Sequence, residues 1–210
     1  MQNVTMVTEI NRIDVIRLFD KHIYPHIIGD LKLLDFIQPK THGNGCSIPT
    51  AMLILSSLEF IGYLLRPTGN LDDTQGNITT ALKHNNYFPD TYTTEVIENL
   101  VIFYRHGIMH SFYPRQTATK IYGIHKSDNI LLIENLVCEG HNITSLNVNV
   151  LSLNFKAFVD KLYQEVFITD DTIILESILK GFKLRYPEYL TNTSPTTDQT
   201  TIPYGVNSNK

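Results

Sequence analysis

Arg105 and His110 are the residues of this chain best suited in type to carry out a reaction. An imidazole titrates near neutral pH, so His110 can accept or donate a proton under ordinary conditions. A guanidinium presents a rigid fork of N–H donors that matches the oxygens of a phosphate, and Arg105 supplies such a group. A proton carrier and a phosphate-binding cation together suit acid–base chemistry at a phosphate ester.

His106 and Glu59 are two further residues that we expect at this site. His106 precedes His110 by four positions, so on a helix the two imidazoles share one face, and His106 can orient a substrate or assist proton transfer. Glu59 interrupts a strongly apolar segment, where an unpaired carboxylate is costly to bury. We therefore expect Glu59 either to pair with Arg105 or to lie in water at a rim.

The segment around Arg105 has the pattern of a helix. Thr93 and Thr94 supply a capping hydroxyl and Glu95 then falls near the positive end of the helix dipole, whereas Pro114 ends the pattern. Apolar residues recur with helical spacing and predict one apolar stripe that continues to Phe112: Ile97, Val101, Tyr104, Ile108 and Phe112.

The spacing of Arg105 and His110 sets a geometric condition on any joint action. Residues five apart on an ideal helix point about 140° away from each other. Three arrangements would bring the two groups together: a long reach of the arginine, a local distortion at Gly107, or a second protomer that supplies the partner group.

The stretch Val101–Pro114 resembles the Arg-polar-x-x-x-His signature of the HEPN superfamily, with Arg105 and His110 at its two ends. An aromatic residue precedes the arginine, and an aromatic residue and a proline follow the histidine. The resemblance implies a helical bundle in which two protomers place their arginine and histidine helices around one cleft. A polar residue that faces the motif, here Glu59, looks like a feature of several HEPN families.

The resemblance also implies an activity. Many HEPN proteins are metal-independent ribonucleases, often toxins or antiviral defence components. His110 would then be the general acid or base for attack by the RNA 2′-OH, and Arg105 would hold the phosphate. The implied partners are a second copy of the chain, RNA or a nucleotide, and an antitoxin or defence protein. The alternative is a non-catalytic HEPN module that dimerises, binds a nucleotide or binds another protein.

The whole chain predicts a mainly α protein of the α+β class. Glu9–Asp20 has the spacing of a first helix, which Pro25 and Gly29 interrupt, and the apolar Ala51–Leu65 indicates a buried central helix. Beyond Pro114 the pattern changes to short β-prone runs separated by turn residues. These runs are Lys120–His125, Ile130–Val137 and Ile143–Leu151.

We therefore expect residues 1–190 to form a single HEPN-like domain. It would consist of an antiparallel helical bundle over residues 9–114, a three-stranded antiparallel β meander over 118–151, and C-terminal helices over 152–186. Residues 191–210 are rich in Thr, Asn, Ser and Pro, and we expect them to form a disordered tail.

Charge and cysteine content restrict the classes of function. A formal net charge of -4 gives no global attraction to phosphate polymers, so any contact with nucleic acid must be local. The two cysteines have no CxxC spacing, which argues against a disulfide framework or a cysteine-rich zinc site.

Two histidine pairs have a spacing that a metal site would use, His106 with His110 and His22 with His26. Pro25 argues against one regular helix for the second pair. Neither pair belongs to a His-Glu-x-x-His motif, so we expect no metal and no cofactor.

The longest apolar run, Ala51–Leu65, is shorter than the ~20 residues that cross a bilayer, and Met1–Asp14 lacks the pattern of a secretory signal. We therefore expect a cytoplasmic protein that does not contact a membrane.

Overall fold

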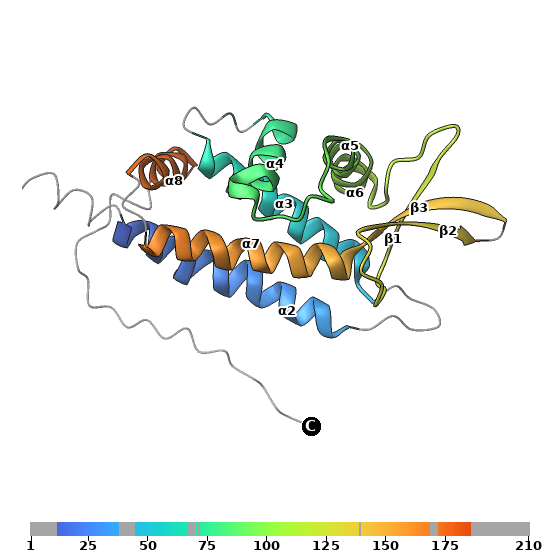
Figure 1. Cartoon of the computed structure of the whole chain (residues 1–210), viewed down its shortest axis with the longest axis horizontal. Coiled ribbons are helices and arrows are strands. Elements are labelled where there is room, and N and C mark those ends of the chain that lie inside the picture. The colour runs from blue at the N-terminus through green and yellow to red at the C-terminus, as the bar shows by residue number, and fades with distance from the viewer. Residues whose placement is uncertain are drawn as a thin grey trace, which may run out of the picture.

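Helices make up most of the protein, and a small sheet projects from one end of them (Figure 1). The computed structural model describes residues 12–37, 45–66, 70, 72–138, 140–168 and 172–185. The predicted tail 191–210 therefore lies outside the described residues. The helical elements are η1 (Phe19–Ile28), α2 (Gly29–Phe36), α3 (Ser47–Leu65), α4 (Thr74–Lys83), η2 (His84–Asn86), α5 (Thr94–Asn99), η3 (Leu100–Arg105), α6 (His106–Ser111), α7 (Val148–Ile168) and α8 (Thr172–Arg185).

One continuous helix runs over residues 12–36, where the sequence predicts an interruption at Pro25 and Gly29. Its middle part, η1, is a π-helix, in which the Gly29 N–H donates to the Tyr24 carbonyl. In a regular α-helix a proline lacks the N–H and its ring meets the carbonyl of residue i−4. The wider π turn relieves that conflict. The predicted break is therefore wrong.

The central helix of the bundle is α3, as the sequence predicts. Ala51, Ile54, Leu55 and Leu58 are fully buried in it. The helix is long and apolar enough to cross a bilayer, but 56% of that window is buried inside the protein. It contacts α2, α4, α7 and α8.

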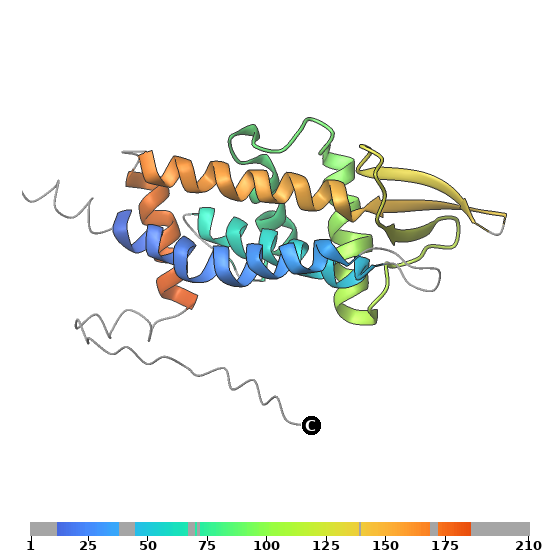
Figure 2. The same ribbon diagram turned by 90° about the horizontal axis from the view of Figure 1, so that it is seen from below.

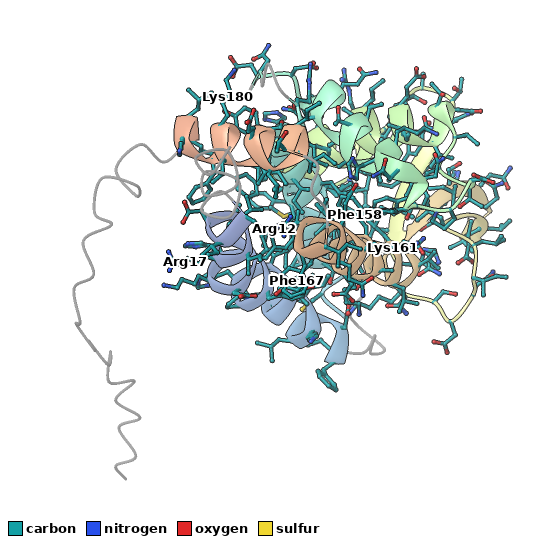
Figure 3. All side chains as sticks on the ribbon, turned by 60° about the vertical axis from the view of Figure 1, so that its left-hand side comes forward. Arg12, Arg17, Phe158, Lys161, Phe167 and Lys180 are labelled. Atoms are coloured by element: carbon teal, nitrogen blue, oxygen red, sulfur yellow. The ribbon has the colours of Figure 1, made fainter. Side chains whose placement is uncertain are left out.

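The helix α7 runs beside the N-terminal helix over most of the length of the bundle (Figures 1 and 2). Asp35 accepts hydrogen bonds from Ser152 and Lys156, and Tyr24 donates to Asp160, so the two helices are antiparallel. Side chains fill the space between the helices in Figure 3, among them Phe158 of α7, which is fully buried.

The predicted helix around Arg105 is confirmed as one continuous helix over residues 94–111, formed by α5, η3 and α6. Thr93 caps it by accepting the N–H of Val96 at 3.3 Å. Four members of the predicted stripe are buried, each no more than 2% exposed: Ile97, Val101, Tyr104 and Ile108. The predicted continuation to Phe112 is wrong, because the helix ends at Ser111 and Phe112, in a left-handed backbone conformation, is 70% exposed. This helix runs across the long helices, next to the sheet (Figure 2).

The sheet is mixed, so the predicted antiparallel meander is wrong. Its strands β1 (Ile121–His125), β2 (Ile133–Cys138) and β3 (His141–Asn147) lie in the order β1-β3-β2. β2 and β3 form an antiparallel hairpin, whereas β1 pairs with β3 in parallel. The segment 126–132 carries the chain past β3 instead of turning straight back, and Asn147 of β3 holds it by donating to the carbonyls of Ser127 and Asn129.

The third predicted strand is also too long, because α7 begins directly after Asn147. The Asn147 side chain accepts the N–H of Asn149 at 3.2 Å, which caps the first turn of the helix. Residues 148–151 are therefore helical, although their apolar side chains also suit a strand.

Candidate functional site

Arg105 and Glu59 form the ion pair that the sequence offers as one of two alternatives. The Arg105 Nε and Nη2 atoms donate to the same Glu59 oxygen, Oε2, at 2.9 and 2.7 Å. The other oxygen, Oε1, accepts the Thr74 hydroxyl at 2.6 Å. The two charged side chains are only 17% and 18% exposed. The carboxylate thus joins three helices, α3, α4 and η3, and fixes the position of the guanidinium.

One guanidinium nitrogen of Arg105 remains available. Its Nη1 atom has no hydrogen-bond partner among the residues that the structure describes. The side chain lines a cavity of about 180 Å³, to which Ser56, Tyr63, Asn77 and Arg185 also contribute. The arrangement offers a positioned N–H donor beside a small polar space, which suits an anionic oxygen.

His106 and His110 are both exposed on α6, and they share one helix face as predicted. Their ring centres lie 6.2 Å apart. Arg105 contacts Glu59 on α3, and the described contacts include no hydrogen bond or ion pair between it and either imidazole. Within one chain, the Arg105 side chain therefore does not bridge the distance to His106 or His110.

Gly107 does not distort the helix, because α6 is regular from His106 to Ser111. The absence of a side chain at Gly107 allows close packing instead. A Cβ at this position would lie 2.3 Å from the Arg115 nitrogen and 2.7 Å from the Tyr113 carbonyl oxygen. The segment after the helix thus crosses directly over Gly107, and the Arg115 N–H donates to the Phe103 carbonyl at 2.7 Å.

Tyr104 ties the same helix to the sheet. Its ring is fully buried, and its hydroxyl donates to the Thr144 carbonyl of β3 at 3.0 Å. Burial raises the pKa of Tyr104 above its usual range, and the neighbouring Tyr122 adds a smaller effect in the same direction. The hydroxyl therefore keeps its proton and acts as a donor. The sequence predicts the burial of Tyr104 but carries no local signal for its hydroxyl partner.

Exposed apolar side chains occur on the helix and in the turn after it. Ile102 and Met109 are 40% and 38% exposed, and Phe112 and Tyr113 are 70% and 54% exposed. Aromatic residues and methionine are enriched where proteins contact one another. This end of the helix therefore combines proton carriers with a surface suited to a protein contact.

A second polar cluster lies on the sheet, and sequence reasoning missed it. His125 of β1 contacts the Ser145 hydroxyl through Nδ1 at 2.7 Å and Glu134 Oε1 through Nε2 at 2.9 Å. Asn147 and Asn129 donate to the two Glu134 oxygens at 3.2 and 3.3 Å. These residues lie on adjacent strands and their connecting loop, so no short motif in the sequence reveals the cluster.

The residue types of this cluster are those of a serine–histidine–carboxylate triad, but Ser145 is only 2% exposed and Glu134 only 9%. A substrate cannot reach the hydroxyl of a serine buried to this extent. The cluster holds the segment 126–132 against the three strands.

The second histidine pair, His22 and His26, lies in the π-helical η1 with ring centres 6.2 Å apart. Within the described part of the chain, no group of three or more His, Cys, Asp or Glu side chains lies close enough to hold a metal ion. Comparison of the chain with protein-family models, with curated proteins and with solved structures gives no match.

Proposed function

We propose that the protein is a metal-independent endoribonuclease of the HEPN type, acting as a homodimer. The observation that carries the proposal is the anchored guanidinium of Arg105. Glu59 holds it beside a cavity, one nitrogen remains unpaired among the described residues, and the exposed His106 and His110 follow on the same helix.

These groups are sufficient in type for RNA cleavage without a metal. An imidazole removes the proton from a 2′-OH, whose oxygen attacks the adjacent phosphorus and displaces the 5′-oxygen of the next nucleotide. A second imidazole protonates that leaving oxygen, so the products are a 2′,3′-cyclic phosphate and a 5′-OH. Arg105 stabilises the charge that builds on the phosphate oxygens. We assign the acid or base role to His110 and a supporting role to His106.

A second protomer is part of the proposal because the groups of one chain diverge. The two-fold axis of a dimer would bring the Arg105 of one copy toward the His110 of the other and would double the positive charge in the cleft. The exposed Ile102, Met109, Phe112 and Tyr113 provide apolar surface for that contact. A local site of this kind is compatible with a net charge of -4.

The test is cleavage of a mixed RNA in the presence of a chelator, with protein purified free of other proteins. Wild type should generate 2′,3′-cyclic phosphate ends, detected by mass spectrometry. Arg105→Ala and His110→Ala should each lose on the order of 100-fold or more in rate, which is the usual contribution of a general acid or base. His141→Ala, an exposed histidine on β3, is the matched control and should cleave normally.

Equal activity in all variants, or no activity in a folded wild-type dimer, would remove the enzymatic proposal. The exposed apolar residues at the end of the helix favour a second candidate, a non-catalytic HEPN module that dimerises or binds a nucleotide or protein. Thermal stabilisation by nucleotides or RNA without cleavage would support that candidate. In either case we propose a cytoplasmic role in toxin–antitoxin or antiviral defence, with a partner protein that controls the cleft.

A further inference from the structure

A larger cavity of about 440 Å³ lies between the N-terminal helix, α3 and α8. We call it the apolar chamber, and its volume falls within the range of small-molecule sites. Ser56, Phe60 and Arg185 line both this chamber and the smaller cavity at Arg105, so the two spaces adjoin. Its apolar lining residues are Leu18, Ile23, Ile27, Leu53, Phe60 and Phe182.

The ionisable residues that line the chamber carry or can acquire a positive charge. Among the described residues that line it, the ionisable ones are His22, His26 and Arg185, and none is a carboxylate. The His22 ring lies 6.1 Å from Phe182, and the guanidinium carbon of Arg185 lies 5.8 Å from the centre of the Phe60 ring. Burial, together with His26 and Lys21, lowers the pKa of His22, and a bound anion would offset that effect.

We propose that the apolar chamber binds a small molecule with an apolar body and one anionic head, of the class of medium-chain carboxylates. The body would lie against the aliphatic and aromatic walls, and the head would contact Arg185 and the imidazoles. A nucleotide suits the chamber less well, because its base needs several hydrogen-bonding partners. The chamber offers Ser56 and Ser57, and the Ser57 hydroxyl already donates to the Leu53 carbonyl at 2.7 Å.

The experiment is calorimetric titration of the full chain with decanoate, compared with neutral decanol, cationic decyltrimethylammonium and AMP. Decanoate should bind with a stoichiometry of one per chain and more tightly than the other three probes. Arg185→Gln should weaken decanoate about tenfold, the effect of losing one charged hydrogen bond. Lys183→Gln is the matched control, since this lysine is exposed on the same helix but does not line the chamber.

Leu53→Trp should abolish decanoate binding by filling the chamber. If that variant does not fold, NMR of the wild type replaces it, and decanoate should show magnetisation transfer to the Phe182 ring and the Ile23 methyl groups. Absence of decanoate binding at millimolar concentration, equal affinity for all probes, tighter binding of AMP, an equal effect of Lys183→Gln, or transfer to other residues overturns the proposal. Neither Arg105 nor His110 lines the chamber, so failure here and failure of RNA cleavage are separate outcomes.

Discussion

The helix cluster of Arg105, Glu59 and Thr74 and the sheet cluster of His125, Glu134 and Ser145 contain similar chemistry but differ in what they leave unused. In the sheet cluster both histidine nitrogens and both carboxylate oxygens contact protein groups. In the helix cluster both oxygens of Glu59 also accept hydrogen bonds. The Nη1 atom of Arg105, however, has no described partner, and the Arg105 side chain lines a cavity. Residue type alone therefore does not distinguish the two clusters, whereas a guanidinium nitrogen without a described partner and an adjoining cavity do.

The largest effect should come from breaking the sheet cluster. Glu134→Ala removes the acceptor of the fully buried Asn147, the partly buried His125 and the exposed Asn129, which should lower the free energy of unfolding by about 3 kcal/mol. Urea denaturation measures the change. Glu134→Gln keeps an acceptor and should cost clearly less, and the proposed RNA cleavage should survive both substitutions in folded protein. Equal costs for the two variants would contradict a role based on hydrogen bonding.

An intermediate effect should follow from Glu59→Ala. The Arg105 side chain loses its anchor but can turn toward the adjoining cavity, so we expect a loss of about 2 kcal/mol in the free energy of unfolding. Glu59→Gln should retain the Thr74 contact and part of the arginine contact, with a smaller loss. Both changes should also lower RNA cleavage, because an unanchored guanidinium is no longer positioned. A destabilised protein that cleaves at the wild-type rate would show that Glu59 has a structural role alone.

The smallest effect on stability should come from His106→Ala and His110→Ala. Both side chains are exposed on α6, so each substitution should change the free energy of unfolding by less than about 0.5 kcal/mol. The same urea titration provides the comparison. A loss above about 1 kcal/mol in the free energy of unfolding for either variant would show that this histidine stabilises the fold, as His125 does.

The parts of the molecule that local sequence pattern determines were predictable. The helix over residues 94–111 follows from a capping threonine and a buried stripe. For Glu59 the cost of an isolated carboxylate left two alternatives, a pair with Arg105 or a position in water, and the structure shows the pair. The apolar α3 likewise stands out by its composition.

Features that depend on contacts distant in sequence were not predictable. The parallel pairing of β1 with β3 depends on how 126–132 packs, and alternation along a strand does not distinguish the two directions. The π geometry around Pro25 is a further departure, because the rule that proline interrupts a helix does not include a change of helix type. The His125 cluster joins residues of three different strands. Its members therefore lie apart in the sequence and form no local motif.

The direct passage from β3 into α7 has a mechanical consequence. Asn147 ends the strand and caps the helix, so no linking residue lies between the two elements. The 21 residues of α7 extend about 30 Å at 1.5 Å per residue, so the helix that continues β3 reaches along most of the bundle (Figure 1). A displacement of the projecting sheet would therefore be transmitted directly to α7, which contacts the N-terminal helix at Tyr24 and Asp35. That helix also forms one wall of the apolar chamber.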